Sequence, residues 1–287
     1  MTKATMHDGN TIDIVIQGEG PAILIPVNPI PVKGPQADEM RKWGADPALG
    51  QALIEGLCDK YRVITFDYEG HVLSNPKPDT LTPDSIAKDF IAIADEAGAD
   101  RFAYYGYSWL ALSGMQLALR TRRVTALIMG GFPPIHGPYK EMLQVTMATH
   151  KQSRSVSNPK QGNPGSKSQS SDDYDWSNVE VTMNKDQTKQ FVTLYQTLQE
   201  FNDREAQSRL VCPRLCFAGS ADRIDYGEPW GNVRVDIVGP LLRQNEEIEK
   251  AGWDVRILEG LDHTGAMQAA NVLPVLRPWL DSNLNGQ

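Results

Sequence analysis

The sequence predicts an α/β fold in which a mostly parallel sheet is covered by helices on both faces. Strand and helix patterns alternate along most of the 287 residues with short links, which is the pattern of repeated strand–helix–strand units. Several strands are apolar at almost every position, as is typical of strands buried on both faces. A chain of this length accommodates one large α/β domain with an insertion, or two small domains.

Four secondary-structure elements are predicted before Thr82, where the clearest helix start in the sequence lies. They are strands at 11–17, 22–27 and 61–67 and a helix at 47–60, identified from apolar periodicity and turn residues. A further helix begins at Thr82, whose hydroxyl precedes Pro83 and Asp84 in a favourable capping order. The apolar residues of this helix end before Gly98, and glycine is common just after the last residue of a helix.

Ser108 lies where an aromatic-rich strand passes directly into an apolar helix within residues 101–120. A junction of one residue forces a strained turn and leaves the side chain beside the free N–H groups of the helix. A hydroxyl in that place is available as a nucleophile, and the helix amides from Trp109 onward would stabilise an oxyanion. Gly106 lacks a side chain where strand and helix crowd each other. The alternative interpretation is that Ser108 only caps the helix.

The alternation resumes with a strand at 124–131 and then stops. Residues 132–210 are expected to form an insertion with a helix at about 139–150, a polar and flexible loop at about 151–173, and a second helix from 184 to about 206. Strands at 214–219 and 253–258 restore the pattern. The insertion therefore divides a body made of residues 1–131 and 211–287.

Acidic residues and a histidine follow the last two strands. Asp222 and Asp225 come after the strand at 214–219, and His263 comes after the strand at 253–258. Ligand sites of parallel sheets lie beyond the carboxyl ends of the strands, where Ser108 and Asn28 also fall. A histidine there accepts the serine proton through one ring nitrogen while a carboxylate holds the other.

The segment Gly106-Tyr107-Ser108-Trp109-Leu110 resembles the nucleophile elbow G-x-S-x-G of the α/β-hydrolase family, with leucine in place of the last glycine. The resemblance extends over nearly the whole chain and implies that Ser108, Asp222 and His263 form a catalytic triad, with Asp225 as the alternative acid. It also implies that the insertion is a cap over the site.

The same resemblance assigns the groups around the triad. The amides of Trp109 and Asn28 are expected to form the oxyanion hole, with Val27 as the other candidate, because Pro29 has no N–H. The side chains of Trp109 and Trp230 are expected to contact substrate under the cap. Residues 67–74 resemble the D-x-R-G-x-G-x-S turn of the family, with Glu69 in the arginine position, and His71 within this turn is assigned a structural role.

Bulk properties restrict the partners. A net charge of −8 without a basic cluster disfavours nucleic acid and an anionic membrane surface, so a small-molecule substrate is expected. The five histidines show no metal-ligand spacing, and the three cysteines are expected to be free thiols, so neither metal nor cofactor is expected. The lack of a signal-like or membrane-spanning apolar run favours a cytoplasmic protein. The sequence leaves the oligomeric state open, including a homodimer.

The sequence is compatible with two functions. The first is a serine hydrolase that cleaves an ester or lactone of a small organic molecule through an acyl-enzyme. The second is a ligand-binding protein that keeps the fold with little or no turnover, because Leu110, Val27 and Glu69 depart from the family pattern near the site.

Overall fold

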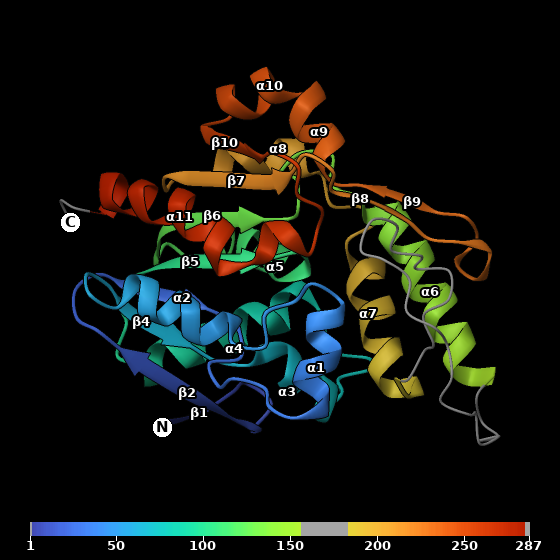
Figure 1. Ribbon diagram of the computed structural model, residues 1–287, viewed down its shortest axis with the longest axis horizontal. Helices are drawn as coiled ribbons and strands as arrows, with labels where there is room; N and C mark the ends of the chain where they lie inside the picture. Colours follow the sequence, from blue (N-terminus) through green and yellow to red (C-terminus); the bar gives the residue numbers. More distant parts are fainter. Residues whose placement is uncertain (1, 156–182, 285–287) are drawn as a thin grey trace.

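The computed structural model describes residues 2–155 and 183–284, and within them the centre is an eight-stranded sheet (Figure 1). The strands follow the order β1-β2-β4-β3-β5-β6-β7-β10. Their bounds are β1 Thr2–Thr5, β2 Thr11–Gln17, β3 Ala22–Ile25, β4 Arg62–Thr65, β5 Phe102–Tyr107, β6 Val124–Gly130, β7 Arg214–Gly219 and β10 Trp253–Leu258. β2 pairs antiparallel with β1 and β4, and the other pairings are parallel. The predicted mostly parallel sheet is confirmed.

Helices cover both faces of the sheet, as the sequence predicts. Figure 1 shows α2 and α11 in front of the strands and α4 and α5 behind them. Their bounds are α2 Leu49–Leu57, α4 Pro83–Glu96, α5 Trp109–Ala118 and α11 Ala269–Leu284. Alternate side chains of β5 enter the two cores: Tyr104 packs in the core that contains α4 and α5, and Tyr105 packs in the core that contains α2 and α11. This alternation explains why the strand is apolar at nearly every position.

The predicted start and end of the helix α4 are confirmed. The Thr82 hydroxyl accepts the backbone N–H of Ser85 at 3.2 Å, and the Thr82 N–H donates to the Ser85 hydroxyl at 2.9 Å, which forms a capping box. After the helix, Gly98 adopts φ 61°, the left-handed conformation that ends many helices. Local sequence is sufficient to specify this element.

Residues 68–74 form a helix, whereas the sequence predicted a turn. The Asp67 side chain accepts the backbone N–H of Gly70 at 2.9 Å and so caps the helix α3, Tyr68–Ser74. Further described elements are α1 Pro35–Lys42, the antiparallel pair β8 Arg223–Asp225 and β9 Arg234–Asp236, η2 Gln207–Arg209, η3 Glu228–Trp230, α9 Val238–Arg243, α10 Asn245–Lys250 and η4 Gly265–Met267.

The chain between β6 and β7 contains α6 Tyr139–Ser155, α7 Lys185–Thr197 and α8 Asp203–Ala206. Figure 1 shows α6 and α7 side by side, beyond the carboxyl ends of β6 and β7. The helix α6 continues through residues 151–155, which were expected to begin the flexible loop, and the rest of that predicted loop lies outside the described residues. The predicted single helix 184–206 is wrong, because the Asn202 side chain accepts the Glu205 N–H and starts α8 separately.

Two further features concern the described residues as a whole. No helix among them combines the length and apolar character that crossing a membrane requires. The cysteines Cys58, Cys212 and Cys216 are free, and Cys216 is buried in β7.

Candidate active site

Ser108 adopts a strained backbone conformation at the junction of β5 and α5. Its φ of 55° and ψ of −129° lie in a region that residues with a side chain rarely occupy. Its carbonyl oxygen accepts the N–H of Ala111 at 2.9 Å and begins the helix, but its side chain makes no capping hydrogen bond. Because the side chain makes no capping hydrogen bond, Ser108 does not act only as a helix cap. Its hydroxyl therefore remains available as a nucleophile.

Gly106 allows the strand and the helix to meet despite the leucine at the end of the elbow. A Cβ atom at Gly106 would lie 2.4 Å from the carbonyl oxygen of Leu110, closer than a real contact permits. The Tyr104 hydroxyl donates to the same carbonyl oxygen at 2.8 Å, and the Leu110 side chain is buried in the core. The leucine at this position is thus accommodated with its side chain buried in the core.

Asp222 lies beside His263, although 41 residues separate them. Its carboxylate oxygens are 2.9 and 3.0 Å from Nδ1 of His263, and the Asp222 side chain is fully buried. The alternative acid, Asp225, has a side chain 63% exposed and forms an ion pair with Arg234 across the β8–β9 pair. The structure therefore brings Asp222, and not Asp225, to the histidine.

The loop that contains His263 packs against the residue before Ser108. The Tyr107 hydroxyl donates to the backbone oxygen of His263 at 2.8 Å, and the two rings are 5.1 Å apart. A Cβ at Gly131 would lie 2.9 Å from Cε1 of the histidine, so the end of β6 also contacts this ring. Ser108 and His263 share no hydrogen bond in the described structure. Such bonds often form only when substrate is bound.

No local sequence signal indicates the contact between Tyr107 and the His263 loop. Tyr107 belongs to the elbow, but its bond to the His263 backbone joins positions 156 residues apart. Only the folded chain shows that Tyr107 fixes the histidine loop.

The backbone amides of the two expected oxyanion-hole residues, Trp109 and Asn28, have no acceptor among the described residues. The competing candidate, Val27, donates its N–H to the Ile25 oxygen at 2.8 Å. The Asn28 side chain accepts the Ile30 N–H at 2.9 Å, which holds the loop after β3 in a tight turn. Hydrogen bonding thus distinguishes the two candidates and favours Asn28.

The two tryptophans with an expected substrate role lie in different surroundings. The Trp109 indole N–H is 3.4 Å from Oε1 of Glu69 on α3, and its ring meets Phe191 of α7 edge to face at 5.4 Å. The Trp230 indole is buried and donates to the Thr149 hydroxyl of α6 at 3.0 Å. Trp230 therefore joins η3 to α6, and its contact with substrate stays a prediction.

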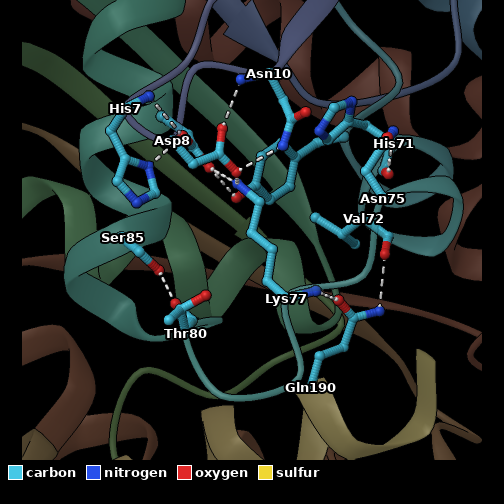
Figure 2. Close-up of polar contacts among 12 residues, drawn as sticks. His7, Asp8, Asn10, His71, Val72, Asn75, Lys77, Thr80, Ser85 and Gln190 are labelled. Atoms are coloured by element: carbon cyan, nitrogen blue, oxygen red, sulfur yellow. Dashed lines mark hydrogen bonds and ion pairs between the residues drawn. The ribbon is translucent and has the colours of Figure 1, made fainter. Parts of the chain in front are cut away.

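A buried ionic network supports the helix α3 (Figure 2). Lys77 Nζ lies 2.7 Å from Asp89 and 2.9 Å from Asp8, and the side chains of Lys77 and Asp89 are 4% and 0% exposed. The Tyr68 hydroxyl donates to Asp89 at 2.7 Å. His71 is also buried in this region, where burial and the charge of Lys77 lower its pKa. The Nε2 atom of His71 is buried without a hydrogen-bond partner among the described residues, so the structural role expected for His71 stays a prediction.

Gln190 connects this network to α7. Its side-chain oxygen accepts the Lys77 backbone N–H at 3.1 Å, and its amide nitrogen donates to the Val72 oxygen at 3.0 Å (Figure 2). Gln187, one turn earlier, donates to the Leu73 oxygen at 2.7 Å. Sequence reasoning missed these residues because their partners lie more than a hundred positions away. The contacts attach α7 to α3 beside Trp109.

No group of three or more histidine, cysteine or acidic side chains in the described ranges, 2–155 and 183–284, could hold a metal ion.

No family model matches this sequence, and no curated protein matches it. Solved structures match over almost the whole chain. An enol-lactonase from Burkholderia xenovorans is 14% identical with a TM-score of 0.60, and the match covers 97% of this chain and 99% of that one. An esterase from Thermogutta terrifontis is 17% identical with a TM-score of 0.58, and the match covers 98% of each chain. An α/β hydrolase from Sphaerobacter thermophilus is 16% identical with a TM-score of 0.51, covering 97% and 99%.

These likenesses, together with the strand order and the strained serine after β5, define the fold class. The chain has the α/β-hydrolase fold, as its sequence predicts.

Proposed function

We propose that this protein is a serine hydrolase that cleaves an ester or lactone bond of a small organic molecule. The observation that carries the proposal is the strained backbone of Ser108, whose hydroxyl makes no capping hydrogen bond. At the same edge of the sheet, the buried carboxylate of Asp222 holds the ring of His263. The similar folds of an enol-lactonase and an esterase support this reaction class. A serine nucleophile disfavours dehalogenase and epoxide hydrolase chemistry, for which the family uses aspartate.

The proposed reaction begins with Ser108 and His263. Asp222 accepts the Nδ1–H of His263, which leaves Nε2 unprotonated and able to take the Ser108 proton as Oγ attacks the carbonyl carbon. The amides of Trp109 and Asn28 donate to the oxyanion. His263 then protonates the leaving alkoxide. Water, activated by the same ring nitrogen, hydrolyses the acyl-enzyme and restores the serine.

Residues 132–210 serve as the cap over this site in our proposal, and residues 1–131 and 211–287 as the catalytic body. Support comes from α7, whose Phe191 ring contacts Trp109, the residue after the nucleophile. The hydrogen bonds from Gln187 and Gln190 to α3 hold α7 in this place. A cap in this position excludes water from the acyl-enzyme until the leaving group departs.

The test compares Ser108→Ala with wild type on a p-nitrophenyl ester. Loss of the nucleophile lowers kcat by about a thousandfold or more. Ser208→Ala is the matched control, because this exposed serine lies on η2 and donates only to the Glu205 oxygen. Unchanged turnover in Ser108→Ala would refute the proposal.

The second candidate, a ligand-binding protein with little turnover, is favoured by one observation, namely the missing hydrogen bond between Ser108 and His263. A fluorophosphonate probe separates the two functions. An activated Ser108 becomes labelled in wild type and in Ser208→Ala, whereas a binding protein stays unlabelled at that position.

A further inference from the structure

Tyr107 links the proposed nucleophile to the proposed base. It precedes Ser108 at the end of β5, and its hydroxyl donates to the backbone oxygen of His263 at 2.8 Å. Its ring lies beside the imidazole, with 5.1 Å between the two ring centroids. Tyr107 is thus joined covalently to Ser108 and by a hydrogen bond to the main chain of His263.

Two glycines at the end of β6 provide the space for the Tyr107 ring. A Cβ at Gly130 would lie 2.5 Å from Cδ2 of the ring, and a Cβ at Gly131 would lie 2.6 Å from its Cε1 and Cζ. The ring centroid is also 6.1 Å from that of Phe217 on β7. Packing this close leaves the ring little freedom, so its hydroxyl is directed at the His263 loop by packing as well as by its own hydrogen bond.

The Tyr107 hydroxyl remains a donor over the working pH range. Burial raises the pKa of this phenol well above its ordinary value, and the charge of Asp222 adds to the rise. A phenol that keeps its proton can donate to a carbonyl oxygen, whereas a phenolate has no proton to donate. The link to the His263 backbone is therefore present in every protonation state of the histidine.

The histidine loop is held from two directions. On the β7 side, the Ala221 N–H donates to the Leu261 oxygen at 2.9 Å, and Asp222 lies 2.9 Å from Nδ1 of His263. A ring held at Nδ1 alone can still turn about that contact. The bond from Tyr107 holds the backbone from which the ring extends, on the side of the nucleophile. Together the two attachments determine the direction of Nε2.

The alignment of the base with the nucleophile has a large effect on rate. Ser108 and His263 share no hydrogen bond in the described structure, so their relative placement depends on the contacts around them. A displacement of about 1 Å between reacting groups lowers the rate by about a hundredfold. A link from the residue before Ser108 to the main chain of His263 keeps the two groups aligned.

We propose that Tyr107 is a positioning residue, which holds His263 in line with Ser108 through its hydrogen bond to the His263 backbone. This inference rests on the proposed hydrolase function and adds a residue to its site. In this role Tyr107 acts through His263 and takes no part in proton transfer.

The kinetic test is Tyr107→Phe, which removes the hydroxyl and keeps the packed ring. We expect kcat for p-nitrophenyl acetate, per site labelled to completion by a fluorophosphonate, to fall at least tenfold, with KM within twofold of wild type. A merely structural role would lower the number of labelled sites and leave the turnover of each site unchanged.

The matched control is Tyr105→Phe, because Tyr105 lies on the same strand and its ring is also 6.1 Å from Phe217. This control should keep at least half of the wild-type kcat. A turnover per labelled site within twofold of wild type in Tyr107→Phe, or an equal loss in Tyr105→Phe, overturns the proposal.

Hydrogen–deuterium exchange separates this inference from the proposed function, because it requires no turnover. The backbone amides of Gly265 and Ala266 donate to Asp262 in the loop that Tyr107 holds. We expect them to exchange at least threefold faster in Tyr107→Phe than in wild type and in Tyr105→Phe. Unchanged exchange refutes the role of Tyr107 even if esters are hydrolysed. Faster exchange in a protein that hydrolyses no ester supports the link and refutes the hydrolase.

Discussion

Asp222→Asn is the change that examines the proposed triad most directly. Both carboxylate oxygens of Asp222 lie within 3.0 Å of His263 Nδ1, so an asparagine amide would place its NH2 group against this nitrogen. An amide N–H donates, and Nδ1 would have to accept. The ring proton would then move to Nε2, where it blocks transfer from Ser108.

The magnitude follows from the tautomer. A histidine held in the wrong tautomer loses about 10⁴-fold in kcat, which corresponds to about 5 kcal/mol of transition-state stabilisation. The fold should survive, because the backbone oxygen of Asp222 continues to accept the N–H groups of Ile237 and Val238, each at 3.2 Å. The loss should therefore appear in kcat and not in the amount of folded protein.

The assay is steady-state hydrolysis of a p-nitrophenyl ester, with circular dichroism to verify folding. Asp225→Asn is the matched control, since its carboxylate is exposed and pairs with Arg234. We expect this control to keep at least half of the wild-type kcat. If Asp222→Asn retained a tenth of wild-type activity, or if Asp225→Asn lost as much, the assignment of the acid would be refuted.

Two further substitutions examine the parts that support the site. Gly106→Ala would bring a Cβ within 2.4 Å of the Leu110 oxygen and 2.9 Å of the Ala111 nitrogen. We expect a loss of about 1–3 kcal/mol in the free energy of unfolding, measured in urea, together with lower activity, and equal stability would contradict the packing described. Lys77→Met would leave the buried Asp89 charge without its lysine, and the expected cost is about 3–5 kcal/mol in the same measurement. Asp89→Asn added to Lys77→Met should recover part of this loss, and a single-variant cost below about 1 kcal/mol would contradict the argument.

The sequence determined those features that depend on neighbouring residues. The strand–helix alternation predicted the parallel sheet, and the order Thr82, Pro83, Asp84 predicted the start of α4. The passage from an aromatic strand into an apolar helix located Ser108 at a junction. Each of these signals lies within a few residues, because capping, turn formation and apolar periodicity are local interactions.

Only the tertiary structure decided which distant groups meet. Asp222 and Asp225 are both acids after the same strand, and the burial of Asp222 against His263 distinguishes them. The buried pair of Lys77 and Asp89, and the carboxylate of Glu69 beside Trp109, likewise have no local signal. These contacts form because packing the sheet and its helices removes particular side chains from water, and a buried polar group is stable only where the fold supplies its partner.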